Sequence, residues 1–296
     1  MPDSPLATAV TRWYDENARD LPWRAPGVGA WPILVSEVML QQTPVARVLP
    51  AWQAWISRWP TPAALAQDSP AEAIRMWGRL GYPRRALRLH ECAVAIVERH
   101  GGVVPADLTA LLALPGIGAY TARAVAAFAY GQRHPVVDTN VRRFVARAVA
   151  GKPDAGPATR PADLAATEAL LPDEPARAAR ASAAFMELGA VICTARAPRC
   201  RACPVTSMCA WYAAGRPAAS GPTRRVQRYV GTDRHVRGLL LAVLREASGP
   251  VRRDQLDRVW HDAAQRSRAL ASLVADGLVE LVGDACVLAG DHPDRR

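Results

Sequence analysis

Lysine is almost absent from this chain. Lys152 is the only lysine, although lysine and arginine together number 37 among the 296 residues. An enzyme that forms a Schiff base needs an amine as its nucleophile. Only the N-terminus and Lys152, which lies in a loop with Gly and Pro, supply one. The sequence therefore argues against chemistry that proceeds through a Schiff base.

Export signals and long apolar runs are also missing. The N-terminal segment MPDSPLATAV carries an acid at Asp3 and has no apolar signal core, and no stretch approaches the length of a membrane helix. We therefore expect a cytoplasmic protein without a membrane partner. Half of the residues are apolar, so the chain can bury a sizeable core.

Cysteines are scarce outside one short loop. Cys92 and Cys286 lie singly in apolar stretches, and with no export signal a disulfide framework is disfavoured. The other four follow the pattern C-x6-C-x2-C-x5-C: Cys193, Cys200, Cys203 and Cys209. Zinc loops usually contain two C-x2-C pairs, whereas this loop contains one. The pattern favours a 4Fe-4S cluster, with zinc as the alternative.

The charge is strongly positive, with a formal net charge of +10 and a pI near 9.9. An excess of this size favours a polyanionic partner such as nucleic acid. The alternative is a compositional bias of the genome, in which arginine has replaced lysine.

Apolar residues at helical spacing predict an all-helical region over residues 5–215. Within it, residues 152–175 are rich in Pro, Gly, Ala and Asp and are expected to form a loose excursion. Residues 214–230 have the composition of a linker. Residues 231–290 predict three helices and a short hairpin, an order typical of a winged helix. The tail after residue 215 has fourteen arginines against ten acids, so its charge alone does not establish DNA binding.

Two segments indicate helix starts that could also carry function. In LPGIGAYTARAV, Gly116 and Gly118 free the backbone before an apolar helix, and exposed N–H groups there can hold a phosphate. An ordinary turn between helices explains the same pattern. In HPVVDTNVRR, Asp138 is positioned to cap the next helix. A capping carboxylate can also be a catalytic one.

The apolar segment WPILVSEVMLQQTPV contains one carboxylate, Glu37. Gln41 lies four residues later and shares its helix face. A narrow solvated stripe would explain both residues. The apolar neighbours of Glu37 would instead desolvate its carboxyl group and raise its pKa toward the range of a general acid.

Together these segments resemble a known family. SEVMLQQT, LGYPRRALRLH, LPGIGAYTARAV, VVDTNVRR, MELGAVICT and the cysteine loop have the order and spacing of MutY-type adenine DNA glycosylases, in the endonuclease III helix-hairpin-helix superfamily. The resemblance covers roughly residues 5–215. It implies a two-lobed all-α glycosylase domain over residues 1–213, with a six-helix barrel at about 25–133 and a cluster lobe formed by 1–24 and 134–213.

The resemblance also implies an activity. Family members flip adenine out of mispairs with 8-oxoguanine or guanine and hydrolyse its N-glycosidic bond. Glu37 would protonate adenine N7, and Asp138 would stabilise the cationic sugar. Tyr120 stands in the hairpin where related lyases carry lysine, so we expect a monofunctional enzyme without efficient AP-lyase activity. The implied partner is double-stranded DNA with such a mispair, bound by a monomer.

Further site residues follow from the resemblance alone. The adenine pocket would contain Trp23, Arg24 and Glu187, although Trp23 also suits a core and Glu187 a helix surface. Gln41 and Tyr82 would wedge into the base stack, although Tyr82 also suits a core. DNA phosphates would contact residues of the hairpin and the cluster loop: Gly116, Gly118, Arg196, Arg199 and Arg201.

This chain departs from the family pattern at three places. Pro83 stands where a second Tyr is common, and ASAAF (181–185) replaces a segment that often contains Gln or Asn. The Nudix-like C-terminal domain that reads 8-oxoguanine in many members has no room here, so the preference for 8-oxoguanine over guanine stays open. The role of the smaller C-terminal unit is open as well.

Three other functions remain as alternatives. A thymine glycosylase acting on T:G mispairs shares the fold, the cluster and both carboxylate positions. An endonuclease III-like lyase is disfavoured because the hairpin lysine is missing. A redox-sensing DNA-binding regulator would also combine a cluster with a winged helix, but has little use for Glu37 in an apolar helix.

Overall fold

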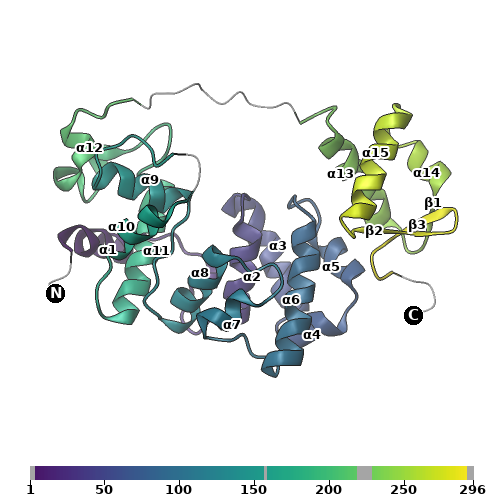
Figure 1. Ribbon diagram of the computed structural model, residues 1–296, viewed down its shortest axis with the longest axis horizontal. Helices are drawn as coiled ribbons and strands as arrows, with labels where there is room; N and C mark the ends of the chain where they lie inside the picture. Colours follow the sequence, from purple (N-terminus) through teal and green to yellow (C-terminus); the bar gives the residue numbers. More distant parts are fainter. Residues whose placement is uncertain (1–3, 157–158, 219–228, 292–296) are drawn as a thin grey trace. The chain divides into compact units, whose positions relative to one another are not determined.

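The structure is a computed structural model that describes residues 4–156, 159–218 and 229–291 (Figure 1). All described elements up to residue 218 are helical, which confirms the all-helical prediction for this region. In chain order they are α1 (Pro5–Asn17), η1 (Pro22–Arg24), α2 (Ala30–Leu40), α3 (Val45–Arg58), α4 (Pro62–Gln67), α5 (Pro70–Trp77), α6 (Arg84–His100), α7 (Leu108–Leu112), α8 (Ala119–Tyr130), α9 (Thr139–Ala148), α10 (Pro161–Glu168), α11 (Pro175–Val191), η2 (Cys200–Ala202), η3 (Thr206–Met208) and α12 (Ala210–Ala213).

Most helix starts have a local cause in the sequence. Thr61 and Ser69 each stand before a proline and accept a hydrogen bond from the first turn of α4 and α5. Asp107 caps α7 in the same way. Helix α6 ends at Gly101, whose left-handed backbone stops the helix.

The described residues form two compact units. Of these residues, the first unit contains 4–37, 105–113 and 117–218 (apart from 157–158), and the second contains 38–104, 114–116 and 229–291. The barrel predicted over 25–133 is divided between these units, so the predicted lobe boundaries stay a prediction. Most of the linker predicted over 214–230 lies outside the described residues.

The core of the first unit lies where α11 packs against α1 and α9 (Figure 1). Its aromatic centre is Phe144 against Phe185, with ring centroids 5.5 Å apart. The excursion predicted over 152–175 is wrong for part of its length, because α10 forms there. Asp163 explains this helix, since its carboxylate accepts from the Arg160 backbone and from Arg142. Composition alone, rich in Pro and Ala, does not predict these contacts of Asp163.

The second unit contains α3 to α6 and the C-terminal domain, which we define as described residues 229–291. In the helical part, Trp55 packs edge-on against both Trp59 and Trp77. The C-terminal domain comprises α13 (Asp233–Glu246), β1 (Val251–Arg252), α14 (Arg253–Asp257), α15 (Ala263–Ala275), β2 (Val279–Val282) and β3 (Ala285–Leu288). The predicted three helices and hairpin are confirmed, and β1 adds a third strand.

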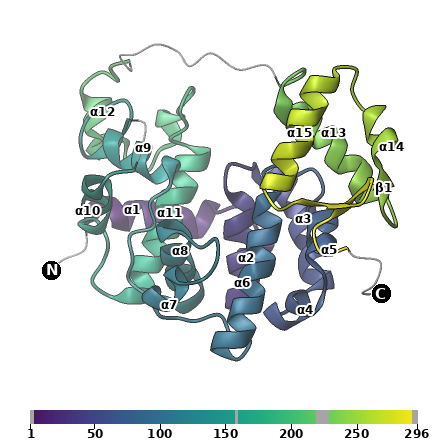
Figure 2. The same ribbon diagram turned by 45° about the vertical axis from the view of Figure 1, so that its right-hand side comes forward.

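The small sheet has the order β1-β3-β2, with both pairings antiparallel. In the hairpin, Val279 pairs with Leu288 and Val282 with Ala285. The apolar core of the C-terminal domain also includes Ala71 and Ile74 of α5, and Figure 2 shows the strands beside this helix. Among the described residues, no helix combines the length and apolar character that crossing a membrane requires.

The close contact between α9 and α11 depends on Gly189. A Cβ atom at this position would lie 2.7 Å from the backbone oxygen of Asn140. We expect Gly189→Ala to lower the free energy of unfolding by about 1–3 kcal/mol, because backbone atoms cannot swing aside. Chemical denaturation measures the loss. The matched control is Gly29→Ala, whose Cβ would meet nothing within 4 Å, and an equal loss in both variants would contradict this packing.

Candidate active site

Glu37 is a buried carboxylate on α2, with 6% of its surface exposed. Burial raises its pKa to about 7, and the nearby charge of Asp138 acts in the same direction. A hydrogen bond from Tyr120 and the charge of Arg24 oppose this rise. The desolvation predicted from the apolar neighbours is therefore confirmed. A carboxyl group with this pKa can hold or release a proton near neutral pH.

Tyr120 lies in the first turn of α8 and hydrogen-bonds to Glu37 through its hydroxyl group. Burial and the negative charges of Glu37 and Asp138 raise the pKa of Tyr120 well above its usual value. The phenol is therefore protonated and donates to the carboxylate. Its oxygen also lies 4.0 Å from the sulfur of Met186.

Asp138 caps α9, as its position in the sequence predicts. One oxygen accepts from the backbone N–H groups of Asn140 and Val141, at 2.9 and 2.7 Å, and the other accepts from the Asn140 amide at 2.7 Å. Burial raises the pKa of Asp138, although these hydrogen bonds act to lower it. The cap therefore holds both carboxylate oxygens in place, close enough to Glu37 to influence its pKa.

A second buried carboxylate, Glu187 on α11, has ion-pair partners. Its side chain is fully buried and accepts from Arg19, at 2.6 and 2.8 Å, and from Arg24 at 2.9 Å. Burial alone would raise the pKa of Glu187, but the two arginines outweigh it and lower the pKa. Glu187 is thus not a helix-surface residue, and Trp23, next to Arg24, is buried. Sequence reasoning missed Arg19, because nothing local links it to a residue 168 positions away.

Two hydrogen-bonded arginines connect this region with the cysteine loop. Arg143 donates to the Asn140 side chain at 2.9 Å and to the Cys193 carbonyl at 2.7 Å. Because Asn140 also donates to Asp138, a continuous chain of hydrogen bonds joins Asp138 to Cys193. Arg147 donates to the Cys193 sulfur at 3.5 Å and to the carbonyl of Thr194 at 2.7 Å.

The four loop cysteines line one pocket together with Arg147 and Trp211, and all four are free thiols. Among the described residues, no group of three or more His, Cys, Asp or Glu side chains converges as the ligands of one metal ion would. Arg196, Arg199 and Arg201 in this loop are all exposed, and Arg199 also donates to the Val191 carbonyl at 2.6 Å.

The structure also places the residues predicted to bind phosphate and to wedge into the base stack. Gly116 has φ +75°, and a Cβ there would lie 2.7 Å from Cβ of Arg88, so no other residue fits. Gly118 is the N-cap of α8. Gln41 and Tyr82 belong to the second unit. Tyr82 is 49% exposed, so it is not a core aromatic, and its hydroxyl donates to Gln42 at 2.8 Å.

The opposite pKa shifts of Glu37 and Glu187 have opposite effects on stability. The folded protein holds the Glu37 proton more tightly than the unfolded chain, so this group removes stability as pH rises from 4.5 to about 7. The free energy of unfolding of Glu37→Gln should therefore rise relative to that of the parent protein, by about 2–3 kcal/mol as pH increases from 5 to 8. Denaturation at several pH values measures this gain.

Glu187→Gln is the matched control. Its carboxylate has a lowered pKa, so its stabilising effect is present above the unfolded pKa and lost as pH falls. This variant should therefore be less stable than the parent at pH 8, with a smaller deficit in acid. If the stability of both variants, relative to the parent, changed with pH in the same direction, the opposite pKa shifts of Glu37 and Glu187 would be contradicted.

The sequence and the fold are similar to those of known proteins. Residues 35–167 match the model of the family described as HhH-GPD superfamily base excision DNA repair protein. A solved structure of a thermostable thymine-DNA glycosylase has a similar fold, with a TM-score of 0.63 and 25% sequence identity over 70% of this chain and 95% of that one.

Two mycobacterial relatives are more similar in sequence. The adenine DNA glycosylase of Mycolicibacterium smegmatis is 62% identical over 281 residues, which cover 94% of both chains. The adenine DNA glycosylase of Mycobacterium tuberculosis (strain H37Rv) is 60% identical over 273 residues, which cover 92% of this chain and 89% of the relative. These two alignments cover nearly the whole sequence, most of the C-terminal domain included. This chain therefore belongs to the adenine DNA glycosylase family, within the HhH-GPD superfamily.

Proposed function

We propose that this protein excises adenine from DNA by hydrolysing its N-glycosidic bond, at positions where adenine is mispaired with 8-oxoguanine or guanine. The observation that carries this proposal is Glu37: a buried carboxyl group with a pKa of about 7 beside the second carboxylate, Asp138. Membership of the adenine DNA glycosylase family supports the choice of base. Excision of a mispaired base is the first step of base excision repair.

Two carboxyl groups in different protonation states suit this reaction. Adenine is a poor leaving group until a ring nitrogen is protonated, and the protonated Glu37 would supply this proton at N7. Cleavage then leaves positive charge on the sugar. Asp138 would stabilise this charge and orient the attacking water, since its own oxygens are held by the α9 cap. Tyr120 would hold the Glu37 carboxyl group in position.

The ion pairs around Glu187 support a preorganised adenine pocket. Arg24 contacts Glu187 and its charge also acts on Glu37, so one guanidinium links both carboxylates. Trp23 precedes it in η1 and supplies a buried aromatic ring. We infer that these residues recognise the flipped base. Gln41 and Tyr82 would fill the space that the base leaves in the stack.

Contacts to the DNA backbone would come from two loops of the chain. The N–H groups at Gly116 and Gly118 precede α8 and suit a phosphate. Arg196, Arg199 and Arg201 are exposed in the cysteine loop and would contact further phosphates.

The T:G-specific thymine glycosylase is a weaker alternative. A thymine-DNA glycosylase shares the fold, but at 25% identity, against 62% for an adenine DNA glycosylase. A regulator that only binds DNA would not need a buried carboxyl group with a raised pKa beside a second one.

Adenine release without strand cleavage is the expected result of a direct assay. Labelled duplexes containing A:8-oxoguanine, A:G, T:G or thymine glycol are incubated with the protein and read with and without hot alkali. We expect breaks at adenine only after alkali, and no high-yield covalent adduct on borohydride treatment, because Tyr120 offers no amine. The rate should fall as pH rises above about 7, where Glu37 loses its proton.

Glu37→Gln tests the same mechanism. It should bind the A:8-oxoguanine duplex as the parent does, while excision falls by about two orders of magnitude or more. Cleavage at thymine would favour the alternative enzyme, and binding without release of any base by the parent would favour a regulator.

We also propose that the cysteine loop holds a 4Fe-4S cluster. The four thiols line one pocket, and Arg147 donates to one of the sulfurs, so the donor set and the adjacent positive charge suit a cluster with thiolate ligands. When bound, such a cluster supplies a rigid cross-link within the loop. Arg147 and Arg143 would orient this loop relative to α9.

Iron content tests the cluster. We expect about four iron atoms per chain in the parent protein and a loss of most of them in Cys200→Ser. Cys92→Ser is the matched control, because Cys92 is buried in α6 and lies outside the loop. One zinc ion per chain in place of iron would overturn the assignment.

The C-terminal domain is proposed to be winged-helix-like. Its order of helix, strand, two helices and two strands, with β2 and β3 as the wing, supports this assignment.

A further inference from the structure

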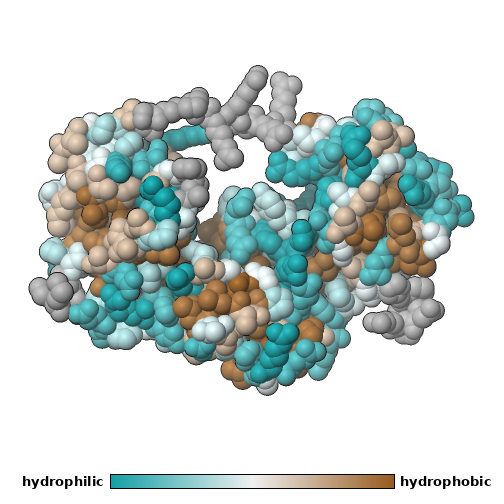
Figure 3. All heavy atoms as spheres, viewed as in Figure 1, coloured by the Kyte–Doolittle hydropathy of each residue, from teal (hydrophilic) through white to brown (hydrophobic). Residues whose placement is uncertain are grey.

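The second unit contains a groove of about 1070 Å³ between the start of α6 and one face of α13. Its lining includes a single acid, Asp276, and eight arginines: Arg47, Arg79, Arg84, Arg85, Arg88, Arg234, Arg237 and Arg245. Figure 3 shows hydrophilic colours over the upper end of α6, where the helix begins. A concave surface with such an excess of positive charge attracts a polyanion.

Most of this charge is not neutralised within the described residues. Arg84 and Arg237 share Asp276. Arg47, Arg79 and Arg234 make no ion pair with a described carboxylate. Arg85 donates to the carbonyls of Val38, Met39 and Gln41, and burial, together with the charge of Arg47, lowers its pKa to about 10. Five of the eight arginines therefore have no ion pair with a described carboxylate, whereas Arg84, Arg88 and Arg237 have one.

Two exposed aromatic rings stand among these arginines. Tyr82 is 49% and Tyr229 50% exposed. The guanidinium groups of Arg85 and Arg234 lie 5.5 and 5.8 Å from the centres of these two rings. Alternating arginine and aromatic side chains suit a nucleic acid, because they contact phosphates, sugars and bases together.

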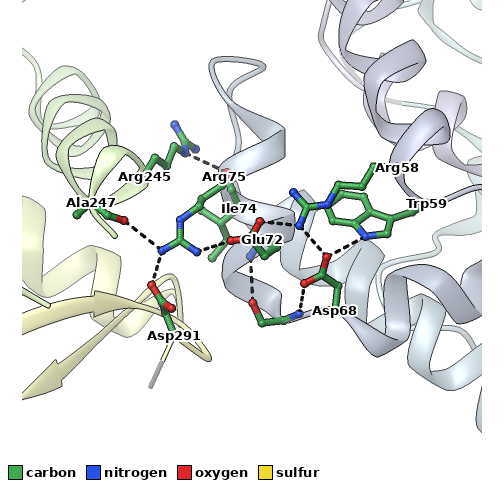
Figure 4. A network of polar contacts seen from close by, with 10 residues as sticks. Arg58, Trp59, Asp68, Glu72, Ile74, Arg75, Arg245, Ala247 and Asp291 are labelled. Atoms are coloured by element: carbon green, nitrogen blue, oxygen red, sulfur yellow. Dashed lines mark hydrogen bonds and ion pairs between the residues drawn. The ribbon is translucent and has the colours of Figure 1, made fainter. Parts of the chain in front are cut away.

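Polar contacts join α13, one wall of the groove, to the neighbouring helix α5 (Figure 4). Arg245 of α13 donates to the Ile74 carbonyl of α5 at 3.0 Å. Arg75 of α5 forms ion pairs with Glu72 and with Asp291, and also donates to the Ala247 carbonyl. Beneath them, Ile74 belongs to the apolar core of the C-terminal domain. These contacts fix the position of α13 relative to α5 within the second unit.

Helix α15 lacks comparable features. In a winged helix the third helix commonly faces the DNA, but the exposed positions of α15 are mostly alanine and serine. Its one exposed arginine, Arg268, lies 3.6 Å from Asp233 in an ion pair. Of these two helices, α13 is therefore the one that carries arginines into the groove.

We propose that this groove binds the backbone of duplex DNA beside the mispair, with α13 rather than α15 as the DNA-contacting helix of the C-terminal domain. This rests on the proposed function, since the groove includes Gln41 and Tyr82, the proposed wedge residues. The domain would then supply affinity for the duplex, while the chemistry stays with Glu37 and Asp138.

The double variant Arg79→Ala/Arg234→Ala tests the groove, because it breaks no described ion pair. Binding to an A:8-oxoguanine duplex is measured by fluorescence anisotropy from low to high salt, and excision at saturating protein in a single turnover. We expect roughly tenfold weaker binding at physiological salt, and a slope of log K against log salt reduced by about 1.8 for two lost phosphate contacts. The single-turnover rate should change less than about twofold.

Arg268→Ala and Arg252→Ala are the matched controls, being exposed arginines of the same domain outside the groove. All variants are first compared by thermal melting. The proposal would be overturned if the groove variant kept the parent's DNA affinity and salt slope. It would also be overturned if Arg268→Ala weakened DNA binding more than the groove variant does. A parent protein that binds DNA but releases no adenine would contradict the proposed function, while the binding comparison would still decide on the groove.

Discussion

The cap that Asp138 forms on α9 is the interaction on which the rest of the site depends. Three hydrogen bonds fix its two oxygens, and the same Asn140 that donates to it lies against Gly189 of α11. Through Asn140 and Arg143 the cap is also connected with the cysteine loop. Helix capping, helix packing and loop position therefore converge on one carboxylate. A change at any of these contacts would move the charge that faces Glu37.

Two buried carboxylates in the first unit differ because their partners differ. Glu187 receives two guanidinium groups, so its charged form is stabilised. Glu37 receives the hydroxyl group of Tyr120 and lies near the negative Asp138, so burial prevails and its neutral form is favoured. The protein thus stabilises one carboxylate as an anion that can accept hydrogen bonds, and the other as an acid that can give up a proton. Arg24 acts on both and couples the two environments.

Local patterns predicted a large part of this arrangement. The apolar neighbours of Glu37, the position of Asp138 before a helix and the spacing of the cysteines all depend on residues close in sequence. The third strand and α10 were missed, since β1 has two residues and α10 depends on the Asp163 contacts. Three contacts between distant segments were also missed: Arg19 with Glu187, Arg143 with Cys193, and α6 with α13. Each joins residues at least 50 positions apart. Such pairs follow from packing, which periodicity does not encode.

The near absence of lysine connects several of these features. Arg142 and Arg147 are only 5% exposed, and Arg147 donates to three backbone carbonyls and one cysteine sulfur. A guanidinium group has five N–H donors and keeps its charge when buried, whereas a buried ammonium group readily loses its proton. Arginine can therefore hold loops in the interior and also line the groove proposed to bind DNA. The same choice leaves the hairpin without an amine, so in the proposed mechanism the chemistry would fall to carboxyl groups and water.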